Sequence, residues 1–271
     1  MKTPITCRRF LAGLAASLLT WPAFAQISEP NIGLKDYENV LQNSVKPNDQ
    51  GTASEVDYAW LAQHQADLDA VTDTFSGVSE ADFSRWSDDA QLAFLINAYN
   101  AFTLQLILTK YPDLESIKDL GSLFRSPWKQ KFVALLGKTR SLDDIEHTMI
   151  RGQFDEPRIH AAVNCASCGC PALLAQPFKA ETLDQQLHQA MSRFLADAER
   201  NYFEASSKTL WLSPLFDWYG EDFEKSAGSV ERYARDYSGP LGWPPSPADT
   251  KLRIRFTDYD WQLNDLGRCA D

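Results

Sequence analysis

The sequence predicts an α+β fold, a single domain of several helices packed on a small antiparallel sheet. The first observation is a long apolar segment over 88–109, where apolar residues cover nearly the whole circumference of a helix. The second is a set of short segments with strand character at 132–136, 209–213 and 252–256. The third is that the sequence has no internal repeat and no low-complexity tract.

Helical spacing of apolar residues recurs along the chain. It predicts helices from Leu34 onward, over 56–75 and over 173–195. Ser79 precedes Glu-Ala-Asp and is placed as an N-cap, which marks the start of a further helix. Ser141 and Asp144 form a partial capping box, and we expect a helix after it.

Two local patterns indicate extended structure. Gly137-Lys138 predicts a hairpin turn directly after the segment 132–136. The apolar segment 158–164 is expected to be a short buried strand.

The N-terminus has the features of a secretory signal peptide. Basic residues open the chain, an apolar run covers 10–19, and Ala23-Phe24-Ala25 is a small-x-small cleavage signal. The run is too short to span a bilayer, and we expect no membrane span in the mature chain. Arg8-Arg9 also fits a twin-arginine signal, so both export routes stay open. We expect cleavage after Ala25 and a periplasmic or secreted protein.

The mature chain is strongly acidic. Without Lys2, Arg8 and Arg9, 23 basic residues stand against 37 acidic ones, which gives a formal charge of −14. Nucleic-acid binding needs clustered Lys and Arg, so no nucleic-acid partner is expected. The charge is explained by solubility.

Four cysteines remain after the signal peptide is removed: Cys165, Cys168, Cys170 and Cys269. An even number in an oxidising compartment permits two disulfides, one disulfide with two thiols, or none. Four cysteines are too few for a disulfide scaffold, so the fold depends on its hydrophobic core.

Several separated motifs occur in a familiar order. They are I-N-A-Y-N-A at 96–101, S-L-D-D-I-E-H at 141–147, P-R-I-H-A-A-V-N-C-A-S at 157–167, C-P at 170–171, L-S-P-L-F-D-W-Y at 212–219 and Y-D-W-Q-L-N at 259–264. Together they resemble the DUF547 family, a family of unknown function. The resemblance implies a domain over 56–265, after a signal over 1–25 and an arm with the first helix over 26–55, and before a tail over 266–271.

The resemblance also sorts the cysteines. The family pattern C-A-S-x-x-C-P places cysteines at Cys165 and Cys170, so that Cys168 and Cys269 are additional here. This implies a structural disulfide between Cys168 and Cys269. The sequence alone leaves the connectivity open.

The motifs suggest a site built on the cysteines, for which there are three hypotheses: a nucleophilic thiol, a redox-active cysteine pair and a metal site. A nucleophilic Cys165 needs a base or cation nearby, which His160 would provide, with Glu146 and His147 behind it. A ligand would contact residues in the same motifs, namely Asn97, Tyr99, Asn100 and Arg158. The run I-H-A-A-V also resembles the histidine strand of papain-like and transglutaminase-like enzymes, although the segment 88–109 lacks their cysteine.

Redox chemistry and metal binding are the alternatives at the same cysteines. Four residues separate Cys165 from Cys170, and a tight loop closes that distance for a permanent or a reversible disulfide. C-x2-C-x-C with His160 has enough ligands for zinc but crowds them on one loop, so we expect no metal and no other cofactor.

The remaining signals have structural explanations. Trp211, Trp218, Tyr219 and Trp261 are expected in core and strand packing. The sequence therefore predicts a Cys/His site that acts on a small-molecule or peptide-like ligand. One candidate ligand is a low-molecular-weight thiol, for example glutathione. The chemistry would be acyl transfer, hydrolysis or thiol exchange. The alternatives are a redox-active dithiol protein and a non-catalytic binding module with structural disulfides.

Overall fold

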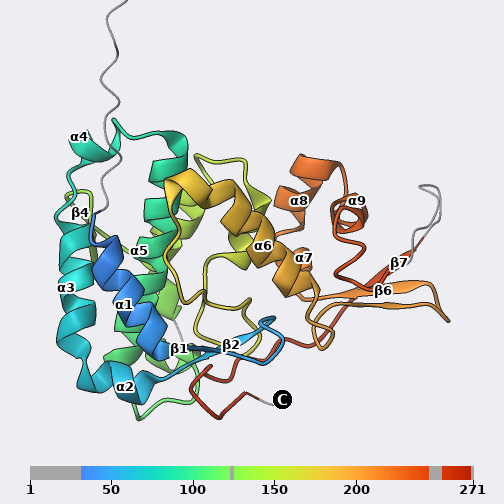
Figure 1. The fold of residues 1–271 in the computed structure, drawn as a ribbon, viewed down its shortest axis with the longest axis horizontal. Coiled ribbons are helices and arrows are strands. Elements are labelled where there is room, and N and C mark those ends of the chain that lie inside the picture. The colour runs from blue at the N-terminus through green and yellow to red at the C-terminus, as the bar shows by residue number, and fades with distance from the viewer. Residues whose placement is uncertain (1–31, 123–124, 244–251, 270–271) are drawn as a thin grey trace, which may run out of the picture.

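Helices surround one central helix in the larger part of the molecule, and a small sheet with three short helices forms the smaller part (Figure 1). The computed structural model describes residues 32–122, 125–243 and 252–269. The predicted signal peptide over 1–25 lies outside the described residues.

The central helix is α5 (Asp88–Leu108), and it begins where the Ser87 hydroxyl accepts a hydrogen bond from the amide of Ala90. Helices α2 (Tyr58–Gln63) and α3 (Gln65–Ser76) pack against it, with α1 (Leu34–Ser44) and α4 (Glu80–Phe83) nearby. The prediction of a helix buried on most sides is confirmed. Among the described residues, α5 is the one helix long and apolar enough to cross a membrane, but 89% of its most apolar window is buried in the protein.

Three small sheets complete the fold. β1 (Val45–Pro47) pairs with β2 (Ser54–Val56), and β3 (Val133–Leu135) pairs with β4 (Lys138–Arg140), both antiparallel. The third sheet has the order β5 (Tyr202–Glu204), β6 (Thr209–Leu212) and β7 (Arg253–Phe256). The pairing of β5 with β6 is antiparallel, whereas β6 and β7 are parallel. The α+β prediction is confirmed, with this parallel pair as the exception to antiparallel sheets.

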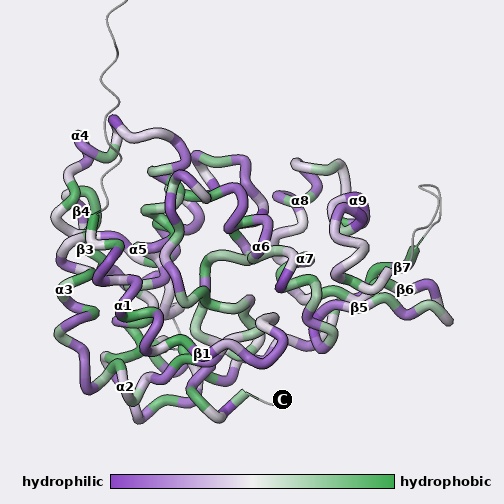
Figure 2. The backbone as a smooth tube through the Cα atoms, viewed as in Figure 1, coloured by the Kyte–Doolittle hydropathy of each residue, from purple (hydrophilic) through white to green (hydrophobic). Residues whose placement is uncertain are grey.

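The core has two clusters that meet at η4 (Pro157–Ala161), a 3-10 helix. The first cluster surrounds α5. The second lies between α6 (Leu183–Leu195), the sheet β5–β7 and the helices α7 (Leu215–Trp218), α8 (Gly220–Ala227) and α9 (Val230–Arg235). Ile159 packs in the first cluster and Ala161 in the second. Helices α1 and α3 carry hydrophobic and hydrophilic residues side by side, as expected for helices that cover a core (Figure 2).

The predicted strand over 158–164 is wrong. Pro157 occupies the first turn of η4, and the Glu156 carboxylate accepts the amide hydrogen of Arg158, so the segment starts as a capped helical turn. Its apolar residues are buried between the two clusters, without strand pairing.

The helix predicted over 173–195 begins only at Leu183, after the short 3-10 helix η5 (Ala180–Thr182). The backbone of Phe178 explains the late start. Its amide and carbonyl groups both bond to the side chain of Asn97, at 2.9 and 2.8 Å, instead of to a helix. The segment predicted over 56–75 likewise divides into α2 and α3 at His64.

Candidate functional site

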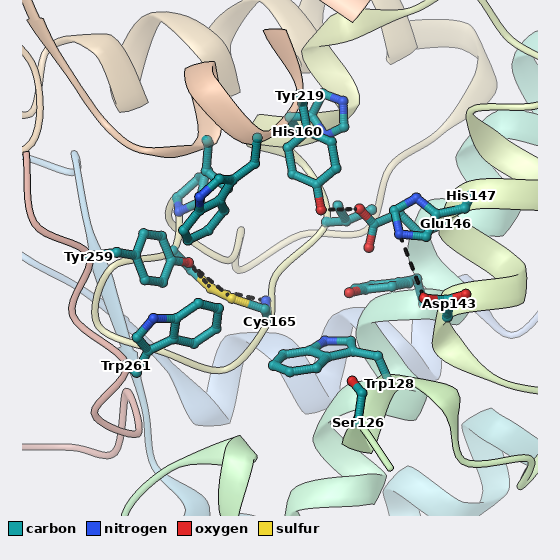
Figure 3. A pocket seen from close by; sticks show the side chains of 16 residues that line it. Ser126, Trp128, Asp143, Glu146, His147, His160, Cys165, Tyr219, Tyr259 and Trp261 are labelled. Carbon is teal, nitrogen blue, oxygen red and sulfur yellow. Dashed lines mark hydrogen bonds and ion pairs between the residues drawn. A yellow bond between two sulfur atoms is a disulfide. The ribbon is translucent and has the colours of Figure 1, made fainter. Parts of the chain in front are cut away.

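A cavity of about 220 Å³ opens where the two core clusters meet. Its walls come from α5, from the segments around η2 (Pro127–Lys129) and η3 (Asp144–Ile150), from the cysteine loop after η4, from α7 and from the chain after β7. The lining residues are Tyr99, Ser126, Trp128, Asp143, Glu146, His147, His160, Val163, Cys165, Cys170, Pro171, Leu215, Trp218, Tyr219, Tyr259 and Trp261. In Figure 3 Tyr259 and Trp261 lie on one side of Cys165, and Glu146 and Asp143 lie on the other.

A disulfide between Cys165 and Cys170 forms part of the cavity wall. Cys170 is 4% exposed, while Cys165 is half-buried. A reagent in the cavity therefore meets the Cys165 sulfur more readily than the Cys170 sulfur. The second disulfide joins Cys168 to Cys269, as the resemblance implied. Two disulfides fit an oxidising extracellular environment.

Hydroxyl and amide groups surround the Cys165–Cys170 sulfurs. The Tyr259 hydroxyl lies 3.1 Å from Cys165 Sγ and 3.4 Å from Cys170 Sγ. The Ser167 hydroxyl is 3.2 and 3.3 Å from the same two atoms, and the amide of Cys165 donates to Cys170 Sγ at 3.0 Å. Burial raises the pKa of Tyr259 to about 12, so its hydroxyl keeps the proton and remains a donor.

Buried amides hold the cysteine loop in place. Asn100 on α5 donates to the carbonyl of Ala162 at 2.9 Å and accepts from the amide of Asn164 at 2.8 Å. Asn164 in turn donates to the carbonyl of Pro171 and accepts from the amide of Ala166. Position 169 requires glycine, because a Cβ atom there would lie 2.8 Å from the Asp260 carbonyl oxygen.

Glu146 comes from η3, a π-helix that begins after Asp143. The hydrogen bonds of the partial capping box are both present, since Ser141 and Asp144 exchange backbone-to-side-chain bonds of 2.8 and 3.1 Å. Glu146 is 6% exposed and accepts a hydrogen bond from the Tyr219 hydroxyl at 2.7 Å. Burial raises the pKa of Tyr99 and of Tyr219, and the charge of Glu146 raises both further. Both phenols therefore face the carboxylate as neutral groups.

His147 and His160 belong to one hydrogen-bonded network through Arg151 and Asp222. Arg151 donates to both carboxylate oxygens of Asp222, at 2.6 and 2.9 Å, and to Nδ1 of His147 at 3.0 Å. A guanidinium has no acceptor, so Nδ1 of His147 accepts and the proton of the neutral ring lies on Nε2. That nitrogen faces Asp143 at 3.7 Å.

His160 is almost completely buried, and its Nε2 lies 2.7 Å from Oδ2 of Asp222. Burial lowers the pKa of His160 despite this carboxylate. The bond from His160, supported by Arg151, holds the pKa of Asp222 well below its usual range. The His160 ring stacks on Tyr219 at 3.8 Å between ring centroids, and its Nδ1 has no hydrogen-bond partner among the described residues.

The motifs around this cavity match a known family. DUF547, a protein of unknown function, matches residues 83–195. This match supports the assignment to the DUF547 family. The match is shorter than the 56–265 expected from the motifs, although the cavity also takes residues from 215–261. No curated protein and no solved structure matches the chain.

The structure brings five of the predicted site residues together. All five lie within the DUF547 match and line the same cavity: Cys165, His160, Glu146, His147 and Tyr99. Of these, the sulfur of Cys165 is engaged by Cys170, Ser167 and Tyr259, whereas His160 bonds to Asp222.

Three predicted ligand-binding residues of the DUF547 match lie elsewhere. Asn97 bonds to the backbone of Phe178, and Asn100 to the backbone on either side of Val163, so both are occupied in holding loops. Arg158 is paired with Glu156 and Asp184. None of the three is among the residues that line the cavity.

Residues beyond the DUF547 match complete the cavity. Trp218, Tyr219 and Trp261 were expected in core and strand packing, and the structure instead places them in the cavity wall. Their motifs, at 212–219 and 259–264, were the available signal, and Tyr259 lies in the second of them. Asp222 follows the first motif by three residues and had no signal. Among the described residues, no group of three His, Cys, Asp or Glu side chains is arranged to hold a metal ion.

Proposed function

We propose that the protein is exported and carries out thiol–disulfide exchange between the Cys165–Cys170 disulfide and a small thiol that enters the cavity. The observation that supports it most is the place of this disulfide in the cavity wall, with donors directed at its sulfurs. The oxidising environment that both disulfides fit, together with the signal-peptide pattern at the N-terminus, supports a periplasmic or secreted location.

The exchange takes place in two balanced steps. The thiolate of the small thiol attacks Cys165 Sγ, forms a mixed disulfide, and displaces Cys170 as a thiolate. A second small thiolate then attacks the ligand's sulfur, which releases a small disulfide and leaves Cys165 as a thiolate. Two small thiols are oxidised and the protein disulfide is reduced to a dithiol. The reverse sequence oxidises the protein.

The surroundings of Cys170 favour the first step. The departing thiolate keeps the hydrogen bond from the amide of Cys165 and lies within reach of the Ser167 and Tyr259 hydroxyls. Such donors stabilise a negative sulfur more than a neutral one, so they lower the barrier to its departure.

Exchange is better supported than acyl transfer. A cysteine that attacks an acyl group needs a base to take its proton. Neither ring nitrogen of His160 bonds to Cys165, since Nε2 donates to Asp222 and Nδ1 has no partner among the described residues. The ring stacks against Tyr219, whose hydroxyl extends toward Glu146 (Figure 3). Exchange needs no such base once the attacking thiol is ionised.

The test uses single cysteine variants in folded protein. Cys170→Ser frees Cys165, which we expect to form a mixed disulfide with bis(2-hydroxyethyl) disulfide, seen by intact mass. The matched variant Cys165→Ser frees the buried Cys170, and we expect it to react about tenfold or more slowly. Equal rates for the two variants, or no adduct on Cys165 until the protein is unfolded, would reject the proposal.

The second candidate is a binding protein whose disulfides are structural. The aromatic lining of the cavity favours it, since rings and a few polar groups are usual in small-molecule sites. This candidate predicts ligand binding without any change of thiol state when native protein is exposed to a small thiol.

A further inference from the structure

We infer that the cavity takes a small organic cation, and that the thiol proposed above carries an ammonium group. The identity of the thiol rests on the proposed function, whereas the binding of a cation does not. The inference is drawn from the charge of the cavity wall, from its rings, and from their placement on either side of Cys165.

The charged groups of the wall are carboxylates. Asp143 and Glu146 line the cavity, and no Lys or Arg occurs among its described lining residues. The hydrogen-bond partners of Glu146 are phenol hydroxyls, and Arg151, whose charge interacts with that of Glu146, lies outside the lining and donates to Asp222. Asp143 faces Nε2 of His147 at 3.7 Å, while Nδ1 of that ring accepts from Arg151. A buried carboxylate in such surroundings favours a cationic partner.

Four aromatic rings, those of Trp128, Trp218, Tyr259 and Trp261, also line the cavity. Their centroids lie 4.5 Å apart for Tyr259 and Trp261, 5.6 Å for Trp218 and Trp261, and 5.9 Å for Trp128 and Trp261. Clusters of electron-rich rings attract ammonium groups, most strongly where water is excluded.

A cation already rests on this cluster from outside the cavity. Lys118 Nζ lies 3.6 Å from the centroid of Trp261, and burial lowers the pKa of that lysine. Lys118 is not among the lining residues. The contact shows that the Trp261 ring accepts an ammonium group in this fold.

The placement of the groups selects among thiols. In Figure 3 the Cys165 sulfur lies between the Tyr259 and Trp261 rings and the Glu146 and Asp143 carboxylates. A ligand sulfur at Cys165 therefore leaves its own charged group beside one set or the other. An aminothiol such as cysteamine meets favourable partners on both sides. Glutathione also has an ammonium group, but it would bring two carboxylates into a wall that already carries two, so the glutathione expected from the sequence is a poorer fit.

Binding is tested on oxidised protein with probes that carry no sulfur, so that no exchange takes place. Choline and its neutral isostere 3,3-dimethylbutan-1-ol are titrated against wild type by tryptophan fluorescence, at fixed ionic strength. We expect choline to bind about tenfold or more tightly. Glu146→Gln, which still accepts from Tyr219, should remove most of that preference, whereas Glu199→Gln on the exposed surface should keep it. Equal affinities for the two probes in wild type would overturn the inference.

Exchange is tested separately on protein with a reduced Cys165–Cys170 pair. The three reagents are cystamine, bis(2-hydroxyethyl) disulfide and dithiodipropionate, and each rate is divided by the rate of the same reagent with a free thiol. The corrected rates should fall in that order, by about tenfold between the first and the last. If no disulfide reacts but choline is preferred, the proposed exchange fails and the cation site stands. If all three react at equal corrected rates and choline is not preferred, exchange stands and the cation site fails.

Discussion

At the residue scale, we expect the reactivity of reduced Cys165 to depend on the hydroxyl of Tyr259. This group lies within reach of both sulfurs and keeps its proton because burial raises its pKa to about 12. It can therefore stabilise a thiolate on either cysteine after reduction.

Replacing Tyr259 by Phe removes this donor and leaves the ring. We expect alkylation of reduced Cys165 by iodoacetamide at pH 7 to slow by about tenfold, since a hydrogen bond to a charged group contributes about 1.5–3 kcal/mol. The control is Tyr202→Phe, whose ring is 37% exposed on β5. An unchanged rate in Tyr259→Phe would show that the hydroxyl does not act on the thiolate.

His160 gives the fold a pH dependence. Its pKa is lowered in the folded state, so below about pH 6.5 the unfolded chain binds more protons at this ring than the folded protein does. Proton uptake then favours unfolding. We expect the free energy of unfolding to fall as the pH decreases from about 7.5 to about 5.5, a range above the titration of Asp222.

The measurement is urea unfolding across that range. His160→Gln should weaken the dependence of the unfolding free energy on pH, whatever it does to the absolute stability. The control is His188→Gln at an exposed helical site, which should leave that dependence as it is. A slope that persists in His160→Gln would assign the pH dependence to another group.

Part of the site was predictable at this scale. Five residues lie in motifs that are rich in polar and ionisable side chains, and the sequence analysis therefore assigned them to one candidate site: Cys165, His160, Glu146, His147 and Tyr99. Asp222 could not be found this way, because it lies 62 residues from His160 and only the fold brings the two together.

At the element scale, α5 positions the cysteine loop through Asn100. Its side chain bonds to two backbone groups on a segment more than 60 residues away. Removing it leaves a buried carbonyl and a buried amide without partners, each at a cost of about 1–3 kcal/mol.

Asn100→Ala should therefore destabilise the protein by about 2–4 kcal/mol in denaturant unfolding, and should make the disulfide loop easier to reduce. Asn43→Ala on α1 removes a comparable bond at an exposed site and should change stability by less than about 0.5 kcal/mol. A loss in Asn100→Ala no larger than in Asn43→Ala would mean that water replaces both bonds.

The elements show where periodicity is informative. It predicted α5 because a long apolar run has few alternatives, and it predicted β6 and β7 within a residue or two. Periodicity failed at 158–164, because a short buried helical turn and a short buried strand have the same apolar sequence pattern. Pro157 was the one local signal for the turn. It failed again before Leu183, because the bonds from Asn97 to Phe178 depend on the tertiary structure.

At the scale of the whole molecule, the Cys168–Cys269 disulfide ties the C-terminal segment to the cysteine loop. It joins residues 101 positions apart, whereas Cys165 and Cys170 are five apart. Chain entropy assigns the longer loop about 4.7 kcal/mol and the shorter about 2 kcal/mol.

The double variant Cys168→Ser/Cys269→Ser should lose about 2–5 kcal/mol of unfolding free energy, and Cys165→Ser/Cys170→Ser less. Both are measured by guanidinium unfolding under non-reducing conditions. The reverse ranking would mean that the pocket disulfide has the larger structural role, which would count against a reversible bond.

Exchange at Cys165 is tested most directly by a short pulse of cysteamine on native, oxidised protein, followed by alkylation and peptide mapping. Exchange in the cavity predicts labels on Cys165 and Cys170, with Cys168 and Cys269 still joined. Labelling of both disulfides in parallel, or of neither until the protein is denatured, would contradict it.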